Sequence, residues 1–167
     1  MQLPETLLKS LNDQIALELS SAYAYFGMAA WFEHQALTGF ATWMKLQGKE
    51  ELGHAKKFYE YVIDRGGRVQ LQALGQPVQE FASPLAVFEA SLAHEQKVSA
   101  AICAIHEAAG NAKDYATQSF LKWFLDEQVE EEKTVNEMIG RLRLIGDSRP
   151  GLFQLDREAA RRAEAEK

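Results

Sequence analysis

The chain has 167 residues and a formal net charge of −6. This length can bury a substantial core, and the apolar fraction of 47% is ordinary for a globular protein. The acidic balance argues against a nucleic-acid binder, which normally shows a concentrated basic face. No stretch is long and apolar enough to span a bilayer, and residues 1–5 lack the basic and apolar regions of a signal peptide. We therefore expect a soluble cytoplasmic protein that binds neither nucleic acid nor a membrane.

The first amphipathic pattern predicts a helix from about Thr6 to His34. Its inward positions recur at helical spacing: Leu11, Ile15, Glu18, Ala22, Tyr25 and Ala29. Glu18 stands where an aliphatic residue is expected. A carboxylate in an apolar stripe needs a partner, because burying an unpaired charge is unfavourable.

A second helix follows a short connection, which makes it an antiparallel neighbour of the first, with Thr38 as the predicted N-cap. It ends at Gly66-Gly67, and its inward stripe is Phe40, Met44, Gln47, Glu51, His54, Phe58 and Tyr61. Glu51 and His54 are three residues apart on one face, so both can reach one metal ion. Carboxylate-bridged di-iron bundles use this Glu-x-x-His spacing. The motif is weak alone and gains weight from its apolar surroundings.

Residues 68–83 lack helical periodicity and contain Gly75 and Pro77, so they predict a long connection. An extended segment of this length can run along the whole preceding helix, because a strand rises about 3.3 Å per residue and a helix about 1.5 Å. We therefore expect a crossover that makes the second and third helices parallel.

The third helix is predicted from Ser83-Pro84 to Gly110-Asn111, where serine caps the helix and proline takes its first position. Its inward stripe is Phe88, Ser91, Glu95, Val98, Ile102, Ile105 and Ala109. Glu95 again interrupts an apolar face. The single cysteine, Cys103, cannot form an intrachain disulfide, and its apolar helical surroundings favour a small core residue over a catalytic thiol.

The fourth helix is predicted from an Asp114 cap to Gly146, with the inward stripe Leu121, Phe124, Gln128, Glu131, Val135, Met138, Leu142 and Ile145. A short fifth helix is expected around Leu152, Phe153, Leu155 and Ala159. These patterns predict one all-α domain over residues 1–167. It consists of a four-helix bundle at 1–146 with one long crossover between the second and third helices, and a short fifth helix and tail at 147–167.

Each long helix thus carries a polar interruption near its middle, and packing the helices side by side would bring these residues into one layer: Glu18, Glu51, His54, Glu95, Gln128 and Glu131. We call this set the polar layer. The inward stripes contain no lysine or arginine to balance the carboxylates, so a cation is the expected partner. The alternative is that some stripes are rotated by one position and their acids face solvent.

A carboxylate-rich site with one imidazole suits iron or manganese better than zinc, calcium or magnesium. The ligands are sufficient for two ions. One would lie against Glu18, Glu51 and His54, and the other against Glu95 and Glu131, with Glu51 able to bridge them. Two adjacent ferrous ions can deliver two electrons to one dioxygen or peroxide.

At this point the residues resemble the ferritins, most closely the haem-free bacterial type, and the similarity covers nearly the whole chain. It is carried by Glu-Leu-Ser around Glu18, Tyr25, Lys49-Glu50-Glu51-Leu52-Gly53-His54, His94-Glu95-Gln96, and Phe120-Leu121-Lys122-Trp123-Phe124 leading into Glu127-Gln128-Val129-Glu130-Glu131-Glu132-Lys133. The resemblance implies a ferritin-like four-helix bundle. It also implies a first iron on Glu18, Glu51 and His54.

By the same resemblance, a second iron would be held by Glu51, Glu95 and Glu131, with Gln128 close to it. A third, looser iron site is implied at Glu50, Glu127 and Glu130. Tyr25 and Trp123 match aromatic residues beside the centre and are candidates for supplying an electron, with core packing as the alternative for both. The remaining histidines His34, His94 and His106 are expected on the surface or behind the ligands.

The family implies iron storage: a ferroxidase oxidises Fe²⁺ with dioxygen or peroxide, and a shell of twenty-four subunits stores the product as a ferric mineral. The fifth helix would line one class of channel. Leu52 stands where bacterioferritins carry their methionine haem ligand, so no haem is expected. The fourth helix also lacks the second Glu-x-x-His of those proteins, having Gln128-x-x-Glu131 and Glu127-x-x-Glu130 instead.

Two other functions remain open from the sequence. One is an acidic helical scaffold that binds cations without catalysis. The other is a di-iron oxidase or oxygenase that acts on an organic substrate, which the short chain and the absence of an evident pocket in its inward stripes disfavour.

Overall fold

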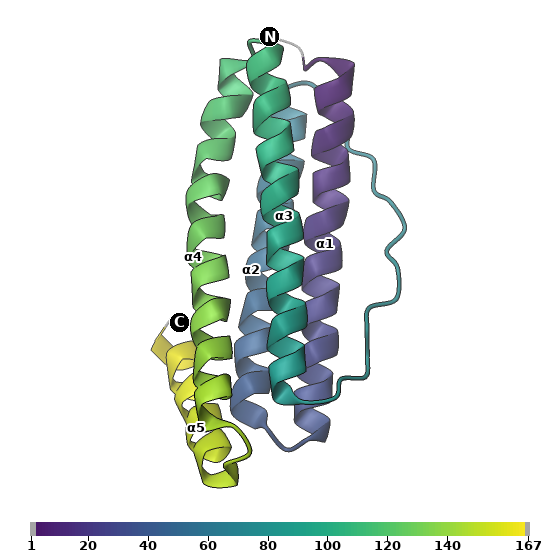
Figure 1. The fold of residues 1–167 in the computed structure, drawn as a ribbon. Helices are drawn as coiled ribbons and strands as arrows, with labels where there is room; N and C mark the ends of the chain where they lie inside the picture. Colours follow the sequence, from purple (N-terminus) through teal and green to yellow (C-terminus); the bar gives the residue numbers. More distant parts are fainter. Residues whose placement is uncertain (1–2, 166–167) are drawn as a thin grey trace.

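The computed structural model describes residues 3–165, which form five helices and, within that range, no strand. The helices are α1 (Glu5–His34), α2 (Thr38–Asp64), α3 (Pro84–Asn111), α4 (Tyr115–Ile145) and α5 (Arg149–Ala165). The first four lie side by side as a bundle, and α5 packs at the end where α2 begins (Figure 1). The predicted all-α bundle is confirmed. No helix within residues 3–165 has the length and hydropathy needed to cross a membrane.

The crossover between α2 and α3 runs along the outside of the bundle beside α1, so α2 and α3 are parallel as predicted (Figure 1). Asn12 of α1 binds the first residues of the crossover. Its Nδ2 donates to the Arg68 carbonyl at 3.1 Å, and its Oδ1 accepts from the Gln70 amide at 2.7 Å. Near its end, Phe81 packs edge to face on Trp31, with ring centroids 5.9 Å apart. The segment therefore has fixed contacts to α1 at both ends.

Two predicted helix caps are confirmed and one is wrong. Ser83 Oγ accepts from the Ala86 amide at 3.1 Å, and Asp114 Oδ1 accepts from the Thr117 amide at 3.2 Å. Thr38 is not a cap, because the helix already includes it and no side chain from its own N-terminus caps α2. The N-terminus of α2 is capped from α5 instead, because Asp156 Oδ1 accepts a hydrogen bond from the Phe40 amide at 2.8 Å.

This contact explains a glycine at the second position of α2. A Cβ atom at Gly39 would lie 1.7 Å from the backbone oxygen of Asp156, so only glycine lets α5 approach this closely. Asp156 is itself buried, and Leu155 and Ala159 of α5 complete the apolar contact with the bundle. The fifth helix is longer than expected, beginning at Arg149, and it leaves Phe153 63% exposed.

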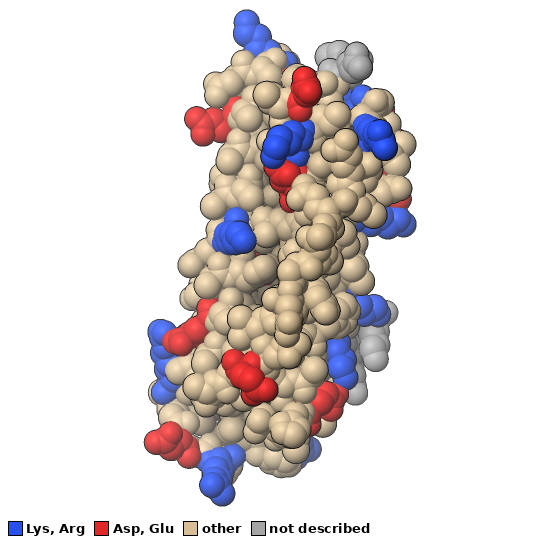
Figure 2. Space-filling model, turned by 90° about the vertical axis from the view of Figure 1, so that its right-hand side faces the viewer, with Lys and Arg blue, Asp and Glu red and all other residues tan. Residues whose placement is uncertain are grey.

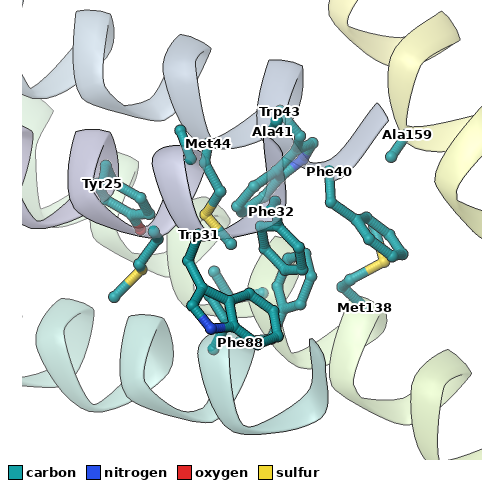
Figure 3. Close-up of a cluster of buried hydrophobic side chains, with 14 of the residues drawn as sticks. Tyr25, Trp31, Phe32, Phe40, Ala41, Trp43, Met44, Phe88, Met138 and Ala159 are labelled. Carbon is teal, nitrogen blue, oxygen red and sulfur yellow. The ribbon is translucent and has the colours of Figure 1, made fainter. Parts of the chain in front are cut away.

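Among the described residues, the apolar core forms two clusters, one on each side of the polar layer. The first lies toward the α1–α2 turn and is rich in aromatic rings, including Phe32, Phe40 and Phe88, whose centroids are 5.2 to 5.8 Å apart (Figure 3). The second lies toward the start of α1 and includes Leu11, Phe58 and several aliphatic residues of α3. Polar side chains thus interrupt a core that is otherwise continuous along the bundle.

The predicted inward stripes are buried except at their ends, where Tyr61 and Ile145 are partly exposed. The interpretation of Cys103 as a core residue is wrong, because its side chain is exposed. It follows Ile102, which is fully buried, and one residue along a helix rotates a side chain by about 100°. The apolar neighbours of Cys103 therefore face inward while the thiol faces outward.

Replacing Asp156 with alanine should lower the free energy of unfolding by about 1 kcal/mol, because the buried Phe40 amide at the α2 N-terminus loses its acceptor. Chemical denaturation of the metal-free protein would measure this change. Asp156→Asn is the matched control, since it keeps a side-chain oxygen, and it should recover most of the loss. Equal losses for both variants would contradict the capping role.

Candidate metal centre

All six residues of the polar layer are buried between the four long helices. The exposed fraction is 0% for Glu18, Glu51 and Glu95, 4% for His54 and Gln128, and 7% for Glu131. The alternative that some of these acids face solvent is therefore wrong. The helical spacing predicted this placement, because each residue continues the apolar stripe of its own helix.

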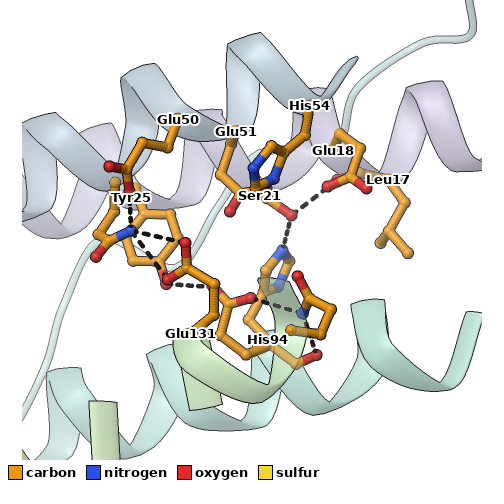
Figure 4. A network of polar contacts seen from close by, with 12 residues as sticks. Leu17, Glu18, Ser21, Tyr25, Glu50, Glu51, His54, His94 and Glu131 are labelled. Carbon is orange, nitrogen blue, oxygen red and sulfur yellow. Dashed lines mark hydrogen bonds and ion pairs between the residues drawn. The ribbon is translucent and has the colours of Figure 1, made fainter. Parts of the chain in front are cut away.

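Glu18, Glu51 and His54 form the tightest group within the layer. One potential ligand atom from each lies within 4.8 Å of the others, and Figure 4 shows the three side chains turned toward one another. Among the described residues, this is the only group of three or more histidine, cysteine or acidic side chains with that geometry. His54 Nδ1 lies 3.6 Å from Glu51 Oε2, which is too long for a hydrogen bond.

The same group contains all the buried side-chain polar atoms that lack a hydrogen-bond partner among the described residues. They are Glu18 Oε2, both oxygens of Glu51, and His54 Nδ1. Buried polar atoms without partners are rare in folded proteins. Four of them converging from three side chains fit a bound cation, and the donor set of two carboxylates and one imidazole suits iron.

Gln14 supports this group, although the helical stripes did not predict it. Its Nε2 donates to Glu18 Oε1 at 2.8 Å, and both side chains are buried. One oxygen of Glu18 is thereby held by the protein while the other stays open toward Glu51 and His54. The signal was a glutamine one helical turn before Glu18, a spacing that allows contact.

Glu95 lies on the α3 side of the layer, and both of its oxygens accept hydrogen bonds. The Tyr25 hydroxyl donates to Oε1 and also lies 3.0 Å from Ser91 Oγ. Gln128 Nε2 donates to Oε2 at 3.1 Å. Tyr25 is therefore both a buried core residue and a direct partner of a candidate ligand, and its role in supplying an electron stays a prediction.

Glu131 and Glu50 are joined through Gln47. The Gln47 Nε2 atom lies 2.5 Å from Glu50 Oε2 and 3.1 Å from Glu131 Oε2. Glu50 and Glu130 are exposed and Glu127 is half-buried, so the residues of the expected third site lie at the edge of the layer. The second and third iron positions stay predictions, because only the first group has converging open ligand atoms.

Burial without a counter-charge dominates the electrostatics. It raises the pKa of Glu18 and of Glu51 well above the ordinary value. The charge of Glu51 raises the pKa of Glu18 further, and the charge of Glu95 does the same for Glu51. Burial also raises the pKa of Glu95, against the lowering effect of its hydrogen bonds with Tyr25 and Gln128. The pKa of Glu131 rises to about 8 through burial and then the charges of Glu95 and Glu50.

Trp123 borders the layer but is not a core residue, since 40% of it is exposed. Its ring meets His54 edge to face with centroids 5.5 Å apart, and Lys57 Nζ lies 2.9 Å from its centroid. His94 is half-buried, and its Nε2 lies 2.7 Å from Ser21 Oγ, which is not a candidate ligand (Figure 4). His34 is exposed.

The metal-free protein should gain more stability from Glu131→Gln at pH 8 than at pH 5. The folded-state pKa of Glu131 is about 8, above its value of 4.5 in the unfolded chain, so the folded state binds more protons between these values. The protein with Glu131 therefore loses stability as pH rises through this window, by about 1.4 kcal/mol for each pH unit, whereas glutamine does not titrate. Thermal midpoints of both proteins at each pH would measure the effect, and a gain that is independent of pH would contradict it.

Comparisons with known proteins agree with this arrangement. A model of the ferritin-like domain matches residues 8–145. The bacterial non-heme ferritin of Staphylococcus haemolyticus is 44% identical over 161 residues, covering 96% of this chain and 97% of the relative. That of Staphylococcus aureus is 42% identical over 160 residues, with 96% of each chain covered.

The solved open pore ferritin of the archaeon Archaeoglobus fulgidus has a TM-score of 0.94 and 43% sequence identity, over 95% of this chain and 98% of that chain. Both the fold and the sequence therefore match along nearly the full length. The chain belongs to the ferritin family.

Proposed function

We propose that this protein stores iron and that its polar layer is a di-iron ferroxidase centre. The observation that carries the proposal is the convergence of unpartnered atoms on Glu18, Glu51 and His54 in the middle of the bundle. Membership of the ferritin family supports iron as the cation. In this proposal Fe²⁺ is a substrate that passes through the centre.

Glu51 is the proposed bridge between two ions. Both of its oxygens lack protein donors, it is grouped with Glu18 and His54, and the charges of Glu95 and Glu131 are close enough to raise its pKa. Glu95 and Glu131 would complete the second position, with Gln128 close to it, and Glu50, Glu127 and Glu130 would hold a third, looser ion.

The reaction proposed is oxidation of iron itself. Each of two Fe²⁺ ions loses one electron, and one dioxygen takes up both electrons with two protons to give hydrogen peroxide. With hydrogen peroxide as the oxidant, the same two electrons and two protons give two waters. The buried carboxylates favour this direction, because their negative charge stabilises Fe³⁺ more than Fe²⁺.

Storage of Fe³⁺ as a mineral needs a cavity that one bundle lacks, so we propose a shell of twenty-four chains in the cytoplasm. The surface supports association with further copies. Figure 2 shows few charged side chains along the middle of the face that carries the crossover. On the crossover, Leu71 is 68% exposed and Val78 is 65% exposed, so this face offers apolar side chains to a further copy.

An aerobic titration of metal-free protein with Fe²⁺ separates the three candidate functions. The storage ferritin predicts fast oxygen uptake that saturates near two to three irons per chain, then slow mineral growth in a very large particle. A cation-binding scaffold predicts iron binding without faster oxygen uptake. An oxidase of organic substrates predicts oxygen uptake that depends on an added substrate and no mineral.

Glu51→Ala and His54→Ala should each slow the initial rate of iron oxidation at least about tenfold, because each removes a ligand of the first position. Stopped-flow absorbance of the ferric product would measure the rate, and light scattering should show the same particle size as for the unmodified protein. Glu60→Ala is the matched control, since Glu60 is on the same helix with 58% of its side chain exposed. Unchanged initial rates in the first two variants would refute the site assignment.

A further inference from the structure

The two halves of the polar layer differ in how the protein satisfies their ligand atoms. The open atoms all belong to Glu18, Glu51 and His54. In the other half, Glu95 accepts hydrogen bonds from Tyr25 and Gln128, and Glu131 accepts one from Gln47. A cation that enters the first half displaces no protein donor from these atoms, whereas a cation at Glu95 and Glu131 must compete with several.

Gln47 is the donor that competes with metal for Glu131, and it has no ligand role in the proposed centre. Its side chain is buried, with 6% exposed, and its Nε2 lies 3.1 and 3.4 Å from the two oxygens of Glu131. The same nitrogen lies 2.5 Å from Glu50 Oε2. An amide group has two N–H bonds, so one can serve Glu131 and the other Glu50 at the same time.

We propose that Gln47 is a positioning residue that masks Glu131 and so makes the second iron position bind metal more weakly than the first. This inference rests on the proposed di-iron centre. Coordination by Glu131 requires its oxygens to leave the Gln47 amide, while Glu50 can keep its own hydrogen bond. The amide therefore opposes loading of the second position, and nothing comparable opposes loading of the first.

Gln14 provides the contrast within the same layer. It also donates a buried amide hydrogen to a candidate ligand, but it binds only Glu18 Oε1 and leaves Oε2 open. A metal ion can use the open oxygen without displacing Gln14. Gln14 therefore orients Glu18 for metal binding, whereas Gln47 occupies the oxygens of Glu131 that a metal would need.

The test is an anaerobic titration of the assembled, metal-free protein with Co²⁺, which is stable to oxidation under these conditions and reports its ligands by visible absorbance. Gln47→Met keeps the side-chain length and removes the amide. It should tighten the second equivalent of Co²⁺ roughly tenfold, the effect of losing one competing hydrogen bond, and leave the first equivalent unchanged. Gln14→Met is the matched control and should leave the second equivalent unchanged.

The possible results separate the inference from the proposed function. If the second equivalent is unchanged or weaker in Gln47→Met, or if Gln14→Met tightens it equally, the masking role is overturned while the metal centre stands. If the unmodified protein binds no Co²⁺ in the layer, the proposed function itself fails.

A second measurement keeps the inference testable if Gln47→Met does not assemble. Crystal structures of the unmodified protein with one and with two equivalents of Co²⁺ should show the Gln47 amide on Glu131 in the first and withdrawn from it in the second. An amide that stays on Glu131 with both ions bound would overturn the masking role.

Discussion

The burial of carboxylates without a counter-charge is the constraint on which the rest of this structure depends. Glu18, Glu51 and Glu95 are completely buried, and the contacts described for them include no lysine or arginine. An isolated buried charge is strongly unfavourable, so the metal-free protein must keep part of this layer protonated, as the raised pKa values indicate. A bound cation removes this penalty, so cation binding and the stability of the fold are linked.

The surrounding architecture holds the layer in place although the layer itself opposes folding. Apolar clusters on both sides bury large side chains such as Phe32, Phe58 and Phe88. The crossover is tied to α1 through Asn12, and α5 caps the start of α2 through Asp156. A layer between two well-packed regions can be arranged for ligand binding without being optimised for stability, a common feature of functional sites.

Much of this could be predicted from the sequence because helices have a regular period. Glu18, Glu51, Glu95 and Glu131 each continue an apolar stripe, so their burial and common depth followed from spacing alone. Contacts between distant segments left no such signal. The cap of α2 by Asp156 joins residues far apart in the chain, whereas the preference for threonine at helix N-termini predicted Thr38.

The orientation of individual side chains and the partners of buried polar groups were also not predicted from the sequence. Cys103 lies beside the buried stripe position Ile102, and its apolar neighbours were given more weight than its helical offset, which places it off the inward face. The role of Gln14 depends on which oxygen of Glu18 it binds, and that of Gln47 on its position between two carboxylates. Such details require coordinates, because glutamine at a helical stripe predicts neither its partner nor its direction.

The most direct test of this account is anomalous diffraction from crystals of the protein prepared anaerobically with Fe²⁺ and measured at the iron edge. The account predicts a strong iron peak among Glu18 Oε2, Glu51 and His54 Nδ1, the atoms that have no other partner. Iron found only on exposed acids, with none among these three side chains, would contradict it.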